Sequence, residues 1–268
     1  MAEVLSPTRI RLTRVLRYRH RHQIFDGSPY GHSNADLSAA VGLETRNVKI
    51  QGAGTQTTYA RQLFGGHTMA MNGAIYRLEN AEVRRAGQAG ILGRYATHTH
   101  MAGAQARYHY VKSLAVHDSN QRCATIHGSK YYTVFSIACT RVRGHSIFVE
   151  DGAEEWNVID ENLVAGTIRI FNGLKGDLKP ASFWAASAKQ IWRNNFAAGS
   201  VNDGYWHELP SHPHGPSFSM QICPQHGYLG RFVNNTATAN GVQGLRIYPS
   251  YVPWKNPCNW HGGPPDEY

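Results

Sequence analysis

Three histidines and two acidic residues recur at spacings that suit a single catalytic site. His98 and His100 lie two residues apart, so on a β-strand their side chains share a face. His127 follows 27 residues after His100, and the acidic pair Glu150 and Asp151 begins 23 residues after His127. Histidine exchanges protons near neutral pH, and glycoside hydrolysis needs a pair of proton-transferring groups that carboxylates commonly supply. These residues are therefore candidates for proton transfer on a sugar polymer.

Three further residues are predicted to contact a charged substrate. Arg94 and Arg122 begin the segments that carry the histidines, and His145 begins the next such segment. Arginine can hold or neutralise the carboxylate of a uronic acid. The face on which His145 lies is not fixed by its position. We assign Arg94, Arg122 and His145 to substrate binding.

Two kinds of cleavage fit these residues. In a hydrolase, we expect Glu150 or Asp151 to be the acid and His127 or His100 to be its partner. In a lyase, a histidine would remove the proton, and Arg94 or Arg122 would neutralise the uronate.

Two other interpretations of the same residues remain open. Histidines with a nearby carboxylate are suitable ligands for zinc or another divalent ion, so a metal cofactor is an alternative. In the other interpretation the histidines are structural, stacking within a wall of the fold while Glu150 and Asp151 cap a turn. The spacing alone does not decide between these interpretations.

A repeat along the chain indicates which elements position these residues. Seven segments each carry an apolar residue, then Asn or Ser, then a short strand-like stretch. Seven other short strand-like segments alternate with them, and they include residues 94–100, 122–127 and 145–151. A unit of about 23 residues with two or three short strands is typical of one coil of a parallel β-helix. The Asn and Ser positions are Asn47, Asn80, Ser113, Ser136, Asn162, Asn195 and Asn235.

The expected fold is therefore all-β, a parallel β-helix of about seven coils with inserted loops. An irregular β-sandwich is the alternative, although few turn dipeptides support it. Adjacent coils lie about 4.8 Å apart, so polar side chains on one outer face would form a column. We expect His98, His100 and His127 to point outward into this column. Glu150 and Asp151 can both join it only if the strand ends there.

Alternation along the strands assigns the neighbouring side chains. Tyr95, Thr97 and Thr99 are expected on the face opposite His98, while Ala124 and Ile126 point inward. Asparagines at equivalent turns are expected to bond one another from coil to coil. The aromatic residues of 183–184 and 205–206 either line a sugar-binding groove or fill the interior.

Composition limits the class of protein. The chain has 268 residues, of which 41% are hydrophobic, and a formal charge of +9. Six arginines and no acid lie within residues 9–22, which predicts either an edge strand with a solvated arginine face or a contact for an anionic polymer. No nucleic-acid-binding motif accompanies them, so we expect no nucleic-acid partner. We expect a basic cap at 1–40, the β-helix at 41–250 and a Pro/Gly/Trp-rich tail at 251–268.

Targeting signals and cysteines add little. No apolar run is long enough for a membrane span, and the N-terminal sequence lacks the apolar stretch of a signal peptide. On its own, this predicts a soluble chain that is not secreted by the usual route, or a truncated product. The four cysteines form no Cys-x-x-Cys motif, and the pairing of Cys123 with Cys139 is left open.

Three motifs resemble one known family. They are residues 87–101 around Gly93-Arg94-Tyr95, residues 117–128 ending in His127, and residues 144–152 around Glu150. In this order and spacing they resemble the hyaluronan-depolymerising and hyaluronan-binding family that includes cell migration-inducing hyaluronidase, cell surface hyaluronidase and fibrocystin-L. A weaker match runs from about Arg9 to Tyr248.

The resemblance implies a right-handed parallel β-helix, an extracellular or cell-surface location and hyaluronan as ligand. The residues that match the family motifs are Arg94, His98, His100, His127, His145, Glu150 and Asp151. Activity is not uniform in the family, so the resemblance leaves two functions open. The chain either binds and depolymerises an acidic polysaccharide or is a non-catalytic carbohydrate-binding or adhesion module. The oligomeric state is not predicted.

Overall fold

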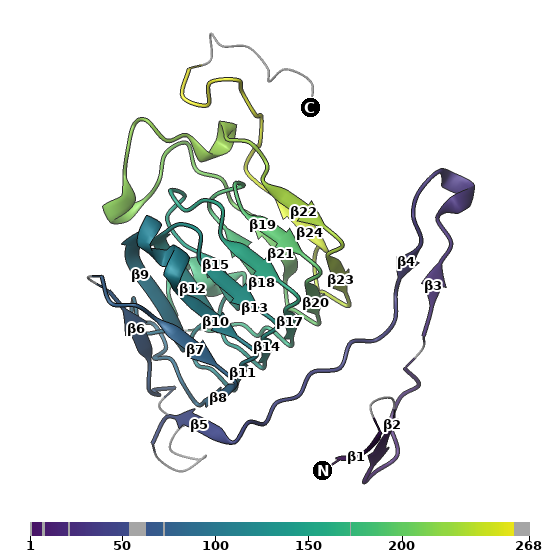
Figure 1. Ribbon diagram of the computed structural model, residues 1–268. Helices are drawn as coiled ribbons and strands as arrows, with labels where there is room; N and C mark the ends of the chain where they lie inside the picture. Colours follow the sequence, from purple (N-terminus) through teal and green to yellow (C-terminus); the bar gives the residue numbers. More distant parts are fainter. Residues whose placement is uncertain are drawn as a thin grey trace. The chain divides into compact units, whose positions relative to one another are not determined.

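Three parallel β-sheets contain most of the strands in the computed structural model, which describes residues 2–6, 9–20, 22–53, 63–71, 73–171 and 173–259 (Figure 1). In each sheet, neighbouring strands are three elements apart in sequence, so each strand pairs with its counterpart one coil away. This is the coil-by-coil pairing of a parallel β-helix, and the predicted all-β fold is confirmed. No helix among the described residues is long and apolar enough to cross a membrane.

Each complete coil contributes one strand to each sheet. The first sheet contains β7 (Arg77–Glu79), β10 (Tyr110–Lys112), β13 (Thr133–Phe135), β16 (Val158–Asp160), β19 (Ile191–Arg193) and β22 (Arg231–Val233). The second contains β5 (Val48–Gln51), β8 (Ala81–Arg84), β11 (Ala115–His117), β14 (Ala138–Thr140), β17 (Leu163–Ala165), β20 (Phe196–Ala198) and β23 (Thr236–Thr238). The third contains β6 (Thr68–Ala70), β9 (Thr97–Gly103), β12 (Ala124–Ser129), β15 (Ile147–Val149), β18 (Ala181–Ala185), β21 (Asp203–His207) and β24 (Leu245–Ile247).

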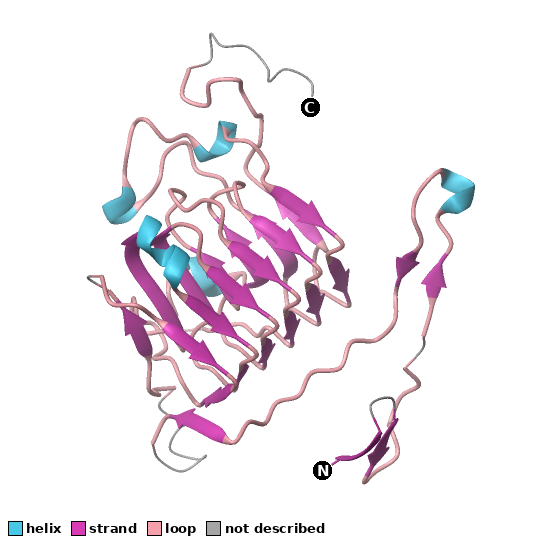
Figure 2. Ribbon diagram, in the orientation of Figure 1, coloured by secondary structure: helices cyan, strands magenta, loops and turns pink. Residues whose placement is uncertain are grey.

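The helical segments of the described residues are short 3-10 turns in the connecting loops (Figure 2). They are η1 (Ser28–Tyr30), η2 (Ala104–Tyr108), η3 (Lys175–Leu178), η4 (Gly215–Ser217) and η5 (Pro224–His226). The strands of the coils therefore supply the rigid framework, and the loops cover parts of it.

The turn between the first and second sheets contains a residue in the left-handed conformation. Asn80, Ser113 and Ser136 have positive φ angles, as expected for residues that tolerate the left-handed region. In later coils the positive-φ residue lies one position before the asparagine of the repeat, and in one of these turns it is Glu161, which precedes Asn162. The Asn and Ser residues of the repeat therefore occupy two different, adjacent positions of the turn.

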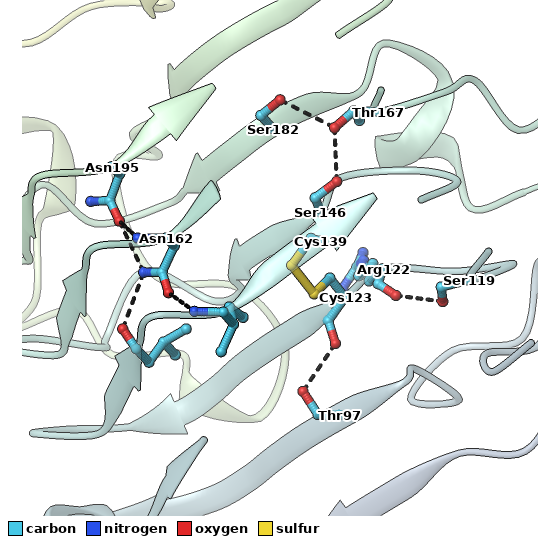
Figure 3. Close-up of a disulfide and its surroundings, with 12 residues drawn as sticks. Thr97, Ser119, Arg122, Cys123, Cys139, Ser146, Asn162, Thr167, Ser182 and Asn195 are labelled. Carbon is cyan, nitrogen blue, oxygen red and sulfur yellow. Dashed lines mark hydrogen bonds between the residues drawn. A yellow bond between two sulfur atoms is a disulfide. The ribbon is translucent and has the colours of Figure 1, made fainter. Parts of the chain in front are cut away.

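The asparagines that follow these later turns form the predicted ladder. Asn162 Nδ2 donates to Asn195 Oδ1 at 2.9 Å (Figure 3). Asn195 Nδ2 in turn donates to Asn235 Oδ1 at 2.9 Å. Each amide also donates to a backbone carbonyl oxygen of the preceding coil, Val134 for Asn162 and Ile159 for Asn195. In earlier coils the same position is apolar, with Leu114 and Ile137 fully buried there. The ladder satisfies buried backbone groups that a turn leaves without partners.

A disulfide and polar ladders reinforce the apolar interior. Cys123 and Cys139 form a disulfide within the core, and a Ser146–Thr167–Ser182 chain of hydroxyl hydrogen bonds lies nearby (Figure 3). A second disulfide joins Cys223 to Cys258. Ile126, Val149, Phe183, Tyr205 and their neighbours fill the interior, which matches the inward assignment of Ala124 and Ile126.

The chain divides into two compact units, Met1–Val41 and Gly42–Tyr268. In the first unit, β1 (Ala2–Ser6) pairs antiparallel with β2 (Arg9–Leu12), and β3 (Ile24–Phe25) pairs antiparallel with β4 (Ala35–Asp36). All four residues of β2 are exposed, and Arg11 pairs with Glu3 at 2.9 Å. Arg21 and residues 260–268 of the predicted tail lie outside the described residues.

Candidate functional site on the outer face of the third sheet

The register of the third sheet places the predicted site residues side by side. His100 pairs with His127, and His98 pairs with Thr125, so all four point to the outer face while Thr99 and Ile126 point inward. Thr125 pairs in turn with Phe148 of β15. Ile126 pairs with Val149, so the position after that pair sets His127 beside Glu150.

His127 is the centre of this arrangement. Its Nε2 donates a 2.8 Å hydrogen bond to Asp151 Oδ2, and its Nδ1 lies 3.7 Å from Glu150 Oε2. The ring of His100 meets it edge to face at 4.6 Å, and the ring of His98 is parallel to it at 5.9 Å. We call His98, His100, His127, Glu150 and Asp151 the His127 cluster.

Both acidic residues reach His127 because the strand ends in front of them. β15 stops at Val149, so the alternation of faces no longer applies to Glu150 and Asp151. The turn that follows is held by Glu154, which is fully buried and accepts hydrogen bonds from the backbone N–H groups of Gly128, Asp151 and Gly152. Burial raises the pKa of Glu154, and these N–H groups offset part of that rise. The turn therefore fixes the carboxylate of Asp151 against His127.

The electrostatics of the cluster differ from one histidine to the next. Burial opposes the charged form of His127, but the hydrogen bond that it donates to Asp151 and the charge of Glu150 outweigh burial and raise the pKa of His127. Burial lowers the pKa of His98 to about 3, so its imidazole is neutral. Burial and the neighbouring His127 also lower the pKa of His100. For Asp151, burial is outweighed by the His127 hydrogen bond, and its pKa is lowered.

Arg122 lies buried next to the cluster. Its side chain is almost fully buried, with its guanidinium 3.5 Å from the ring centroid of Phe148 and 4.3 Å from that of Tyr95. Its nitrogen atoms lie 3.5 Å from Glu150 Oε2 and 3.5 Å from Asp177 Oδ1. Arg122 therefore compensates the buried acids instead of projecting toward a substrate.

Tyr95 was assigned to the wrong face. Its ring packs against His98 at 4.9 Å, and its hydroxyl donates to Glu150 Oε1 at 3.4 Å. Tyr95 precedes β9, so strand alternation does not govern its direction. Burial raises the pKa of Tyr95 to about 12, which keeps the phenol protonated at neutral pH.

The two other predicted substrate contacts lie apart from the cluster. His145 is fully buried, its Nε2 donates to the Gly176 carbonyl oxygen and its Nδ1 accepts the Ala181 N–H. His145 instead supports Phe148, on which its ring stacks at 5.3 Å. Arg94 precedes β9, and its charge contributes to lowering the pKa of His67. Within the described residues, no hydrogen bond or ion pair joins the Arg94 guanidinium to the cluster.

A hollow of about 360 Å³ opens beside His127, Glu150 and Asp151. Phe148 and Trp184 form one wall, with parallel rings 4.2 Å apart. The sequence left open whether these later aromatic residues face outward; Phe183 and Tyr205 fill the core, while Trp184 and Trp206 pack with Phe148 on the outer side. The loop of His214, Gly215 and Pro216 borders the hollow.

A larger hollow of about 690 Å³ lies elsewhere, beyond the ends of β8, β11 and β14. It is lined by charged residues, including Arg141, His117 and Asp118. Arg141 forms hydrogen bonds of 2.7 Å with both Asp118 and Glu44, so the charges of these three residues compensate one another. The smaller hollow is the better candidate because His127, Glu150 and Asp151, a set of neighbouring acid–base groups, line it.

The comparisons with known proteins agree with this fold and place the chain in a family. The sequence pattern described as CEMIP beta-helix matches residues 63–245, which is more than half of the chain. The chain belongs to the CEMIP β-helix family. Mouse fibrocystin-L is 33% identical over 91% of the chain. Human cell surface hyaluronidase CEMIP2 and mouse cell migration-inducing and hyaluronan-binding protein are each 29% identical over 90% of the chain.

This CEMIP β-helix corresponds to only part of each relative. It spans 6% of mouse fibrocystin-L and 20% of the CEMIP2 and hyaluronan-binding relatives. Two further relatives from Dictyostelium discoideum are G8 domain-containing proteins, at 28% and 27% identity. The family thus includes relatives named for hyaluronan binding or hyaluronidase activity and relatives named for neither.

Proposed function

We propose that this β-helix binds an acidic polysaccharide of the hyaluronan type in the hollow beside His127 and shortens it by hydrolysis. The observation that carries the proposal is the His127 cluster itself. One imidazole has a carboxylate bonded to one nitrogen, a second carboxylate near the other nitrogen, and an aromatic wall within the same hollow. Relatives named as hyaluronidases or as hyaluronan-binding support the choice of polymer.

The roles follow from the distances. Asp151 orients the His127 ring and favours its charged form, as a carboxylate does for a catalytic imidazole. Glu150 presents Oε2 toward His127 Nδ1 and belongs to the residues that line the hollow. Two proton-transferring groups then face one substrate bond, which glycoside hydrolysis requires. We assign proton transfer to His127 and Glu150 and positioning to Asp151.

Elimination is less well supported by the protein's own groups. A lyase must neutralise the uronate carboxylate and remove the neighbouring proton. Arg122 is buried beneath Phe148, and no hydrogen bond or ion pair joins Arg94 to the cluster among the described residues. Tyr95 is held in its protonated form by burial. Hydrolysis therefore fits this arrangement better.

Aromatic side chains give the hollow a surface for sugar rings. Phe148 and Trp184 are 6% and 8% exposed, and their stacked rings are supported from behind by His145. Aromatic faces bind apolar ring surfaces at a low cost in conformational entropy. The two disulfides and the relatives named for the cell surface support an extracellular location for this function.

The direct test is the chain length of fluorescent hyaluronan after incubation with the purified chain. We expect shorter products without the ultraviolet absorbance of unsaturated uronates. Glu150→Gln should abolish shortening while retaining the bound polymer in affinity electrophoresis. Glu155→Gln is the matched control, because Glu155 pairs with Lys130 and Lys189 outside the cluster.

Other outcomes of this test are equally informative. Binding without shortening would overturn the catalytic half of the proposal and leave a carbohydrate-binding module. New ultraviolet absorbance would replace hydrolysis with elimination. Neither binding nor shortening by folded protein would overturn the proposed function as a whole.

A further inference from the structure

We propose that His98, His127 and Glu150 together bind one divalent transition-metal ion of the zinc class. This site goes beyond polysaccharide binding and hydrolysis, because it can be occupied without any polymer present. One side-chain ligand atom from each of the three residues lies within 4.8 Å of the other two. The three residues come from three successive coils, so the β-helix framework sets their separation.

The distances are close to those of a metal centre. His127 Nδ1 and Glu150 Oε2 are 3.7 Å apart. In a tetrahedral site with bonds of about 2.0–2.2 Å, two ligand atoms are separated by roughly 3.3 Å. Small rotations of the three side chains would therefore bring their atoms into one coordination sphere without movement of the backbone.

Hydrogen bonds fix which nitrogen of each histidine faces the centre. His98 Nδ1 lies 3.1 Å from the Gly93 carbonyl oxygen, which only accepts, so Nδ1 carries the proton and Nε2 carries the lone pair. His127 Nε2 donates to the Asp151 carboxylate, which leaves the lone pair on Nδ1. Histidine ligands of metals almost always donate their other ring N–H to a carbonyl or carboxylate in this way. Both histidines thus have the outer partners that a metal site requires.

Two of the three ligand atoms lack hydrogen bonds although they are buried. Among the described residues, His98 Nε2 and Glu150 Oε2 have no hydrogen-bond partner. The His98 residue is 1% exposed, so water does not readily supply one. An unpartnered buried acceptor is costly, and a bound cation removes that cost.

The local charge also favours a cation. Glu150 and Asp177 both approach Arg122, while Glu150 and Asp151 both approach His127. Arg122 approaches Glu150 Oε2 at 3.5 Å, which weakens this ligand but leaves the acids in excess. A dication at the centre would balance the remaining carboxylates.

The ligand set predicts which ion is bound. Two imidazoles and one carboxylate suit zinc and its first-row neighbours, whereas calcium requires six or more oxygen ligands. Three protein ligands leave a coordination position open, and Glu150 and His127 line the hollow. With the ion bound, His127 and Glu150 would serve as ligands, and a water polarised by the ion would replace them as the proton-transferring group for hydrolysis.

The test is calorimetric titration of the chelator-treated full chain with Zn²⁺, with Ca²⁺ in parallel and with Co²⁺ followed by visible absorbance. We expect one Zn²⁺ per chain, an intense low-symmetry Co²⁺ spectrum and no competition by Ca²⁺. His98→Gln, His127→Gln and Glu150→Gln should each weaken binding about 100-fold or more, and Asp151→Asn about 10- to 100-fold. His117→Gln should bind as the unmodified chain does, because both His117 ring nitrogens already contact carboxylates.

The alternatives are separable from the proposed function. The metal site would be overturned if the folded chain did not bind Zn²⁺. It would also be overturned if the three ligand variants bound Zn²⁺ as tightly as the unmodified chain. If the buried His98→Gln variant fails to fold, as judged by thermal unfolding, Glu150→Gln decides, because its shape is conserved. Zn²⁺ binding without hyaluronan binding would keep the metal site and reject the polysaccharide. The reverse result would keep the polysaccharide and reject the ion.

Discussion

His127 Nε2 donates a 2.8 Å hydrogen bond to Asp151 Oδ2, although the two residues are 24 positions apart in the chain. The pairing of β12 with β15 brings them together, and the turn built on Glu154 sets the direction of the carboxylate. A single ring is therefore oriented by a residue that belongs to the next coil. Disturbing this bond should affect the cluster without disturbing the core.

Asp151→Asn is expected to reduce hyaluronan shortening while leaving hyaluronan binding in place. The neutral amide no longer favours the charged form of His127, and it can present either its oxygen or its NH₂ to the ring. We expect a loss of about 10- to 100-fold, the range seen when a partner that orients a histidine is removed. The measurement is the initial rate of fluorescent-polymer shortening. An unchanged rate would remove Asp151 from the mechanism.

Trp184→Ala is expected to weaken binding of hyaluronan oligosaccharides by roughly 10-fold, which corresponds to about 1.4 kcal/mol. Trp184 stacks on Phe148 at 4.2 Å and lines the hollow. Trp156→Ala is the matched control, because Trp156 is 40% exposed and is not among the residues that line the hollow. Binding can be measured by affinity electrophoresis or calorimetry. Equal affinities in both variants would show that the aromatic wall does not contact the polymer.

The strands that carry the cluster were predictable because their side chains alternate between an apolar interior and a polar exterior. His98, His100 and His127 are separated by whole coils or by two residues, so a simple period places them on one face. The sequence showed that both acids could face His127 only if the strand ended before Glu150, but it did not show where the strand ends. β15 does end at Val149, which explains how both acids reach His127.

The residues that surround the cluster were not predictable in the same way. Tyr95 and Arg122 lie just before their strands, where tertiary packing and not alternation sets the direction of a side chain. Asp177 reaches Arg122 from an inserted loop, and no period relates the two. The turn residue Glu161 has a positive φ angle that its side chain does not favour, so composition pointed to its neighbour Asn162.

Asn195→Ala is expected to lower the free energy of unfolding by about 2–4 kcal/mol. Asn195 is buried, donates to Ile159 and Asn235, and accepts from the backbone and side chain of Asn162. Its removal leaves several buried groups without partners. Asn235→Ala should cost less, because Asn235 is half-buried in the last coil. Urea denaturation measures both, and equal costs would contradict the importance of the interior ladder.

The free energy of unfolding should depend on pH partly through the protonation of His117. Hydrogen bonding to Asp118, opposed by burial and aided by Glu82 and Glu44, raises the pKa of His117 above its ordinary value of 6.5. A raised folded-state pKa stabilises the protein fully below pH 6.5, and this contribution disappears as the pH rises through the folded-state value. Hydrogen bonding to His117 and Arg141 lowers the pKa of Asp118, so its contribution is present above pH 3.8 and is lost in acid.

His117→Asn should therefore be less stable than the unmodified chain by about 1 kcal/mol at pH 5 to 6, a modest value because Asp118 is partly exposed. The difference should shrink as the pH rises past the folded-state pKa of His117. His109→Asn is a control of opposite sign, because burial lowers the pKa of His109 and its neutral form is the one that folding favours. The unmodified chain should then lose stability relative to this variant as the pH falls below 6.5. Denaturation curves at several pH values test both slopes, and a pH-independent difference for His117→Asn would contradict the assigned ion pair.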